Sequence, residues 1–257
     1  MKKFITRTIT GAVLVLVIIA AILAGKYTFA LLFLSIMTGC IAEFSNLFKQ
    51  SEVKPNRWLS HLVSIILFTV FFMTAQQMLE VKYLWGLLPF LLIIMAAEMY
   101  RKSKKPVENI AVTILSILYL ALPLSLVSFL VFPEVLSGNE YNPKLLIALF
   151  VLIWIYDSGA YLVGVSIGKH RLFERISPKK SWEGAIGGTI IAIAAGYLIS
   201  GFIPEIKPVH WIAISILIVV SSTFGDLTES LFKRYFEIKD SGNVLPGHGG
   251  GPKSELN

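Results

Sequence analysis

The sequence predicts an all-α, polytopic integral membrane protein, and two observations support this prediction. Of the 257 residues, 55% are hydrophobic and only 15% are charged, whereas soluble domains carry charge on about a quarter of their residues. The chain also contains repeated apolar runs of about 20 residues, the length that crosses a hydrocarbon core of about 30 Å. These runs are too continuous for barrel strands, and backbone in lipid must satisfy its own hydrogen bonds, so we expect helices.

Eight apolar segments are expected to span the membrane. They cover residues 5–24, 27–48, 60–79, 83–100, 107–132, 144–168, 184–203 and 209–232. The first five form an N-terminal region, 1–143, and the last three belong to a region, 144–257, in which the polar residues concentrate. No connection is long enough for a separate soluble domain.

The connections between these segments predict how the chain is oriented. Counted from the N-terminus, alternate stretches carry 19 of the 23 Lys and Arg residues. Cationic loops resist translocation, so the N-terminus, the 169–183 loop and the C-terminal end are expected in the cytoplasm, at the plasma membrane. Because these cations lie between apolar runs, the net charge of +7 favours lipid headgroups and phosphates as partners. A nucleic-acid-binding protein would instead carry its cations on one face of a soluble module. Cys40 is the only cysteine, so no internal disulfide can form.

Several carboxylates lie within the apolar segments, where an ionisable group is costly unless it is paired, hydrated or bound to an ion. Glu43 and Glu98 lie near expected helix ends, and we interpret them as interfacial carboxylates. Asp157 lies in mid-helix and shares a face with Tyr161 and with small residues that would let another helix approach. It is expected either to line a cleft or to make an interhelical hydrogen bond.

The last segment carries a polar stripe. At about 100° per residue, Ser222, Asp226, Glu229, Ser230 and Lys233 lie along one face. Two acids and two hydroxyls suit a hydrated cleft that holds Mg²⁺, which takes one or two carboxylates together with substrate phosphates and water. A network of internal ion pairs is the alternative interpretation.

The loop between the sixth and seventh segments supplies cations. The run Ser177-Pro-Lys-Lys-Ser181 directly precedes a helix that is expected to start near Trp182. Cations, hydroxyls and helix N-terminal amides together are suited to binding phosphate. Lys169 and Arg171 are interpreted as topology signals instead.

These motifs together resemble a known family. The run Ser230-x-x-Lys-Arg-x4-Lys-Asp-Ser-Gly-x-x-Leu-Pro-Gly-His-Gly-Gly250 is similar to the signature of the phosphatidate cytidylyltransferases. Residues 177–184, Trp154-x-x-Asp157 and Phe224-Gly-Asp226 resemble other segments of that family, in the same order. The resemblance implies nine transmembrane helices and the Mg²⁺-dependent conversion of CTP and phosphatidate to CDP-diacylglycerol and pyrophosphate, in phospholipid biosynthesis.

The resemblance also implies roles for particular residues. Asp226 would bind the metal, with Asp157 and Glu229 as further candidates, and Asp226, Lys239, Asp240 and His248 would be catalytic. The expected substrate-binding residues are Ser177, Lys179, Lys180, Ser181, Lys233, Arg234, Gly242, Gly247, Gly249 and Gly250. The glycines would let backbone amides approach phosphate closely.

The sequence departs from the family pattern after Gly250. There the family continues with an Asp-Arg-x-Asp sequence and a ninth helix, whereas this sequence reads Gly251-Pro-Lys-Ser-Glu-Leu-Asn257. We therefore expect an incomplete metal site, and a catalytically impaired member of the family is an alternative to an active enzyme. An ion-coupled transporter is a further, less favoured alternative, and a homo-oligomer is left open.

Overall fold

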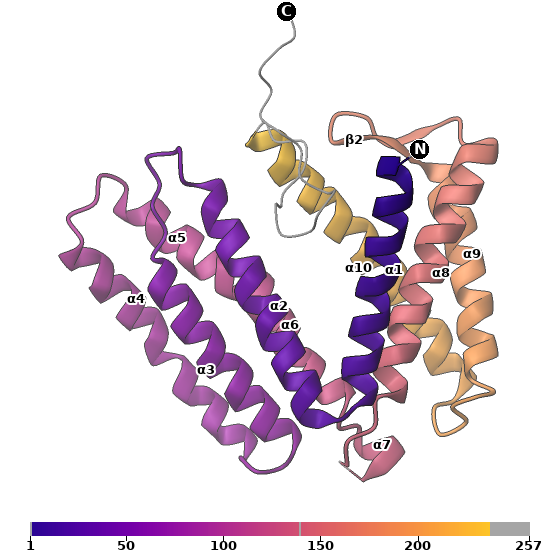
Figure 1. The fold of residues 1–257 in the computed structure, drawn as a ribbon, viewed down its shortest axis with the longest axis horizontal. Helices are drawn as coiled ribbons and strands as arrows, with labels where there is room; N and C mark the ends of the chain where they lie inside the picture. Colours follow the sequence, from indigo (N-terminus) through magenta and orange to yellow (C-terminus); the bar gives the residue numbers. More distant parts are fainter. Residues whose placement is uncertain (1, 139, 237–257) are drawn as a thin grey trace, which may run out of the picture. The chain divides into compact units, whose positions relative to one another are not determined.

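The computed structural model describes residues 2–138 and 140–236. In these ranges seven helices are long and apolar enough to cross a membrane, and a shorter apolar stretch, Val13–Leu23, lies in the first expected segment. The expected all-α, multi-pass membrane fold is thus confirmed (Figure 1). The chain divides into two compact units, residues 1–143 and 144–257, which are described separately below.

Unit 1 is a bundle of helices. Its elements are α1 (Lys2–Leu23), α2 (Lys26–Leu47), α3 (Arg57–Ala75), η1 (Val81–Leu87), α4 (Pro89–Tyr100), α5 (Pro106–Ser116), η2 (Ile117–Ala121), α6 (Leu122–Leu126), η3 (Val127–Leu130) and α7 (Glu134–Ser137). Gly25 joins α1 to α2 with a φ of 133°, a backbone conformation that favours glycine. The Asn56 side chain caps α3 by accepting a hydrogen bond from the Leu59 N–H.

The core of unit 1 follows helical periodicity. Phe29, Phe33, Met37 and Ile41 recur every four residues along α2 and are all buried. Outside the helices, the Tyr141 hydroxyl donates a hydrogen bond to the Ile22 carbonyl over 2.5 Å. This bond fixes the segment that follows α7 against the end of α1.

Two expected segments are less regular than predicted. The fifth was expected as one helix over 107–132, but it changes to a π-helical turn at Ile117–Ala121 and ends in a 3-10 turn. Pro123 follows the π turn and has no N–H to donate to the preceding turn, which explains the irregularity. The fourth segment begins as the 3-10 helix η1, and α4 starts only at Pro89.

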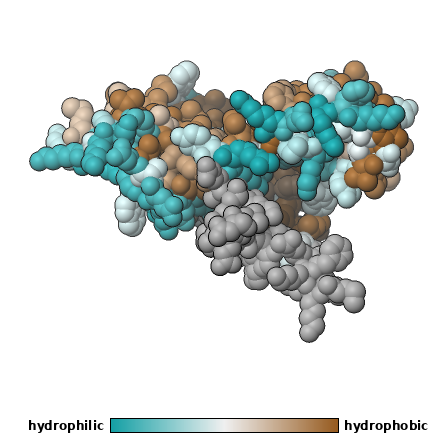
Figure 2. Space-filling model, turned by 90° about the horizontal axis from the view of Figure 1, so that it is seen from above, coloured by the Kyte–Doolittle hydropathy of each residue, from teal (hydrophilic) through white to brown (hydrophobic). Residues whose placement is uncertain are grey.

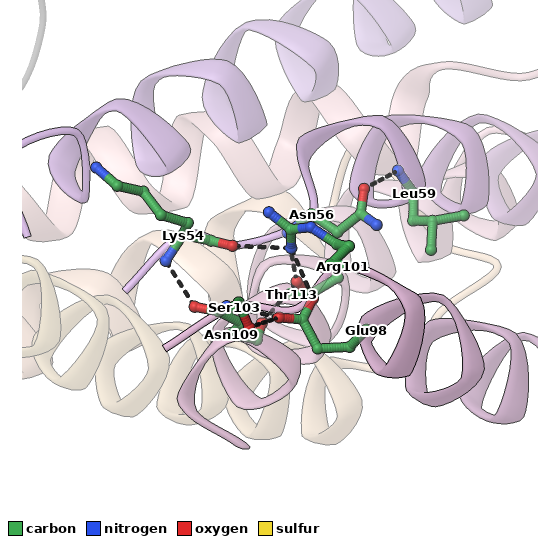
Figure 3. Close-up of polar contacts among 8 residues, drawn as sticks. All are labelled: Lys54, Asn56, Leu59, Glu98, Arg101, Ser103, Asn109 and Thr113. Atoms are coloured by element: carbon green, nitrogen blue, oxygen red, sulfur yellow. Dashed lines mark hydrogen bonds and ion pairs between the residues drawn. The ribbon is translucent and has the colours of Figure 1, made fainter. Parts of the chain in front are cut away.

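Glu98 corrects a sequence-based expectation, because it is buried and not interfacial. Its carboxylate is only 3% exposed. It accepts hydrogen bonds from Asn109 Nδ2 at 2.6 Å, Ser103 Oγ at 2.5 Å and Arg101 Nη1 at 2.6 Å (Figure 3). Arg101 Nη1 also donates to the Lys54 carbonyl at 2.9 Å. The network thereby connects α4, α5 and the segment between α2 and α3, and it satisfies a carboxylate that would otherwise be costly to bury.

Over residues 144–236, unit 2 consists of three long helices and one β-hairpin. The helices are α8 (Lys144–Ile167), α9 (Trp182–Ile199) and α10 (Pro208–Tyr235), and the strands are β1 (Arg171–Phe173) and β2 (Ser177–Ser181). The strands pair antiparallel, with Arg171 opposite Ser181 and Phe173 opposite Ser177. The sequence predicted a loop between α8 and α9, whereas the structure has a β-hairpin there. The helix predicted to start near Trp182 does start there.

Small residues let the three helices approach one another closely. A Cβ on Gly188 would lie 2.8 Å from the Ala160 Cβ and 2.9 Å from its backbone nitrogen, and a Cβ on Gly184 would lie 2.7 Å from the Ala160 carbonyl oxygen. The interface between α8 and α9 therefore requires glycine on the α9 side. Tyr156, Ala192 and Val219 form a buried cluster contributed by all three helices.

Within each unit, hydrophilic side chains gather on the face that Figure 2 shows. In unit 2 this face includes the β-hairpin, which connects α8 to α9 (Figure 1). The polar residues of the 171–181 hairpin therefore lie at one end of the unit 2 helices.

Candidate active site

Unit 2 contains a cavity of about 800 Å³ that all three of its long helices and the hairpin line. The lining residues are Tyr156, Asp157, Ala160, Tyr161, Gly164, Val165 and Gly168 of α8 and the turn after it, Arg171, Leu172, Pro178, Lys179, Lys180 and Ser181 of the hairpin, Ala185 of α9, and Thr223 and Asp226 of α10. Carboxylates and cations from segments far apart in the sequence thus meet at one cavity.

An ion pair at the cavity joins the hairpin to α10. Lys180 Nζ lies 2.6 Å from Asp226 Oδ2. The Asp226 side chain is 51% exposed and that of Lys180 is 33% exposed, so both charges remain hydrated and the pair contributes little to stability. Lys180 and Asp226 can therefore separate, and each can bind an incoming ligand instead.

A second carboxylate lies on the facing helix. Asp157 Oδ1 accepts a hydrogen bond from Ser222 Oγ of α10 at 3.1 Å. At the neighbouring positions, the Tyr156 and Thr223 hydroxyls are 2.5 Å apart. These two contacts hold the polar faces of α8 and α10 together, and Asp157 both lines the cavity and makes the interhelical bond that the sequence left as alternatives.

The hairpin is positioned by the first turn of α9. Ser181 caps that helix by accepting from the Gly184 N–H at 3.2 Å. The Glu183 carboxylate accepts from the backbone N–H groups of Lys169 and His170, at 3.1 and 3.2 Å, and contacts His170 Nδ1 at 2.6 Å. Glu183 thereby ties the start of the hairpin to the helix that follows it, and it fixes where Lys179 and Lys180 emerge.

Two functional positions were missed or undervalued in the sequence. Arg171 was interpreted as a topology signal, yet it lines the cavity because β1 pairs with β2. Glu183 received no role of its own within residues 177–184, although an acid in the first turn of a helix is a recognisable signal of a helix N-terminus. In the part of the chain that the structure describes, the side chains of Lys179 and Arg171 make no hydrogen bond or ion pair.

Other expected site residues lie elsewhere or outside the described ranges. Ser177 is on β2 but does not line the cavity, and Arg234 is exposed near the end of α10. Lys233 Nζ pairs with Glu229 Oε1 at 2.7 Å along α10 itself. The expected polar stripe is thus divided between the cavity and an ion pair within the helix. Lys239, Asp240, Gly242, Gly247, His248, Gly249 and Gly250 lie outside the described residues.

The cavity offers donors that fit Mg²⁺. Among the described residues there is no cluster of three or more His, Cys, Asp and Glu side chains that could hold a metal alone. Asp157 and Asp226 nevertheless line the same cavity, and one or two carboxylates are the usual protein contribution to a Mg²⁺ site whose other ligands are phosphates and water. The donor set therefore fits a Mg²⁺ ion that arrives with a phosphorylated substrate.

The charged groups that line this cavity can act on a ligand electrostatically. Arg171, Lys179 and Lys180 can bind phosphate oxygens, and Asp226 and Asp157 can bind a cation. None of the described lining residues is a cysteine or histidine. Such a site is equipped to bring two anionic groups together and to stabilise charge on a leaving phosphate.

Comparisons with known proteins agree with this chemistry. Residues 5–251 match the model of a family described as "Cytidylyltransferase family". A protein named phosphatidate cytidylyltransferase from Bacillus subtilis (strain 168) is 29% identical over 250 residues, which are 95% of this chain and 89% of the relative. One of the same name from Staphylococcus epidermidis (strain ATCC 12228 / FDA PCI 1200) is 30% identical over 247 residues, 95% of this chain and 90% of the relative. One from Haemophilus influenzae is 43% identical over 111 residues, 41% of this chain and 38% of the relative.

Proposed function

Because this chain belongs to the cytidylyltransferase family, we propose that it is a nucleotidyltransferase that makes CDP-diacylglycerol and pyrophosphate from CTP and phosphatidate. The main support for this proposal is the unit 2 cavity, which carboxylates of two helices and cations of the hairpin line together. The apolar spanning helices around it would keep a lipid substrate in the membrane while its phosphate reaches the cavity.

The reaction needs no general base. A phosphate monoester has a second pKa near 6, so phosphatidate is largely a dianion at neutral pH. One of its oxygens forms a bond to the α-phosphorus of CTP, while the bond from that phosphorus to the β-phosphate bridging oxygen breaks. The electron pair of the broken bond leaves with pyrophosphate, and no proton has to be removed from the nucleophile.

The residues of the cavity would then act by position and charge. Lys179, Lys180 and Arg171 would bind the phosphates of both substrates, offset their repulsion and stabilise the charge that builds on the leaving pyrophosphate. Ser181 already caps α9 and holds the end of β2 in place. The roles implied by the family signature for Lys239, Asp240, His248 and the neighbouring glycines belong to the same proposal.

Asp226 and Asp157 are the described residues that would hold Mg²⁺. When bound, this ion supplies positive charge to the triphosphate as the phosphorus–oxygen bond breaks. Since Lys180 contacts Asp226 at 2.6 Å, binding at this carboxylate would release Lys180 toward the phosphates. Glu229, which pairs with Lys233, remains a further candidate ligand.

We also propose that the hairpin faces the cytoplasm at the plasma membrane. The cationic loops of the sequence support this orientation, and CTP is a cytoplasmic metabolite. We further propose that the chain forms a homo-oligomer, and size-exclusion chromatography of the purified protein would test this.

The experiment is a panel of carboxamide variants assayed for CDP-diacylglycerol formation with increasing Mg²⁺. Asp226→Asn is expected to lower turnover at least about 100-fold, the loss usual for a group that stabilises transition-state charge, and Asp157→Asn is expected to raise the Mg²⁺ requirement. Glu205→Gln is the matched control, since Glu205 is exposed and away from the cavity. Normal turnover of Asp226→Asn would remove that residue from the site, and activity in excess chelator would remove Mg²⁺.

A further inference from the structure

We propose that unit 1 contains a separate binding site for the phosphate of an anionic phospholipid headgroup. A cavity of about 380 Å³ lies at the ends of α2, α3 and α4. Four of its eight lining residues are cations: Lys49, Lys54, Arg57 and Arg101. This site lies wholly within unit 1 and is independent of the reaction proposed for unit 2.

Three of the four cations of this headgroup pocket donate hydrogen bonds to backbone carbonyls. Arg57 Nη2 donates to the Ser45 carbonyl at 3.0 Å, and Lys54 Nζ donates to the Lys49 carbonyl at 2.6 Å. Arg101 donates through Nη1 alone, to Glu98 and to the Lys54 carbonyl. Within the described ranges, the other guanidinium nitrogens of both arginines and the Lys49 ammonium have no partner. The pocket therefore presents unused donors on two arginines that are held in place, together with the Lys49 ammonium, and these groups are suited to binding phosphate oxygens.

Two buried groups show that the pocket is built and is more than a cationic surface. The first is Glu98, which is 3% exposed and holds Arg101 at 2.6 Å (Figure 3). The second is Ser45, which is 1% exposed, lines the pocket, and has a hydroxyl without a hydrogen-bond partner in the described part of the chain. A cationic loop that serves only to orient the chain in the membrane needs neither a buried counter-ion nor a fixed side-chain geometry.

The position of the pocket favours a lipid over a soluble phosphate. Trp58, directly after Arg57, is 88% exposed, and Tyr100, directly before Arg101, is 87% exposed. Exposed aromatic residues at the ends of spanning helices typically lie at headgroup depth. Phe48 and Pro55 complete the lining with apolar surface, which suits the glycerol end of a lipid.

The test uses native mass spectrometry of the full chain in a zwitterionic detergent, titrated with dihexanoyl phosphatidylglycerol, which is not the proposed substrate. One retained lipid is expected. Arg57→Gln and Lys49→Gln should each weaken its binding about fivefold, since a cation near anionic lipid contributes about that factor. Both residues are exposed, so folding should be preserved. Lys104 lies in the connection after α4 and does not line the pocket. Lys104→Gln removes the same charge, but the lipid should bind to this variant as tightly as to the wild-type chain.

Three results would overturn the proposal. Equal weakening by Lys104→Gln would mean that net charge alone attracts the lipid. Equal retention of dihexanoyl phosphatidylcholine would mean that the pocket does not recognise an anionic headgroup. Inorganic phosphate that displaces phosphatidylglycerol at equal concentration would assign the pocket to a free phosphate instead.

Discussion

Replacing Glu98 by Ala should destabilise unit 1 strongly. The substitution removes the acceptor for Asn109, whose side chain is fully buried, and the counter-ion of Arg101. Breaking a buried ion pair costs about 3–5 kcal/mol. Arg101 is 32% exposed and can recover water, so the lower end of that range, about 3 kcal/mol, is expected. Glu98→Gln keeps one acceptor oxygen and loses the charge, and should cost about 1.5 kcal/mol.

The measurement is the free energy of unfolding in mixed micelles with increasing denaturing detergent. Glu108→Ala is the matched control, because Glu108 is 48% exposed and pairs with Lys105 at 3.4 Å; this variant should lose less than about 1 kcal/mol, the scale of exposed interactions. A loss of less than about 1 kcal/mol for Glu98→Ala, the scale of an exposed ion pair, would show that the buried network does not stabilise unit 1. A Gln variant less stable than the Ala variant would show the same.

Three further predictions concern packing, ionisation and catalysis. Gly188→Val should force α8 and α9 apart, because even a Cβ would lie 2.8 Å from Ala160, with an overpacking cost of about 1–3 kcal/mol; Gly39→Ala, with nothing within 4 Å, should not destabilise, and equal thermal stability of the two variants would contradict the close helix contact. Burial raises the pKa of Tyr141 from 10.0 to about 12, so the stability that its neutral hydroxyl contributes should be complete below pH 10 and lost as the pH rises toward 12; an ultraviolet titration of wild type minus Tyr141→Phe checks this, and an ionisation near pH 10 would disprove it. Lys180→Gln should lower kcat about 100-fold, the usual effect of losing one group that stabilises transition-state charge, while Lys169→Gln, whose side chain does not line the cavity, should keep normal activity.

The sequence was sufficient for the spanning helices because their signal is local. Apolar runs of about 20 residues define them, and α8, for example, covers Lys144–Ile167 where 144–168 was predicted. The irregular fifth segment was not predicted, since Pro123 shows that a helix is disturbed but not whether a π turn or a kink results. The hairpin was missed because its strands are only three and five residues long.

Parts of the candidate site depend on contacts that no local pattern contains. The position of Lys180 opposite Asp226 joins residues 46 apart, and Arg171 reaches the cavity only through strand pairing. Glu98 was misinterpreted for the same reason, since its proximity to a helix end suggested water while Asn109 and Ser103 bury it. The sequence around a carboxylate does not reveal which distant side chains will donate hydrogen bonds to it.

We propose above that this chain transfers a cytidylyl group to a lipid phosphate. The most direct measurement incubates the purified chain with phosphatidate, Mg²⁺ and CTP labelled at either the α- or the γ-phosphorus, and then extracts the lipid. We predict that the α label enters the lipid and that the γ label is released as pyrophosphate. A γ label in the lipid, or no label from either position, would contradict the account.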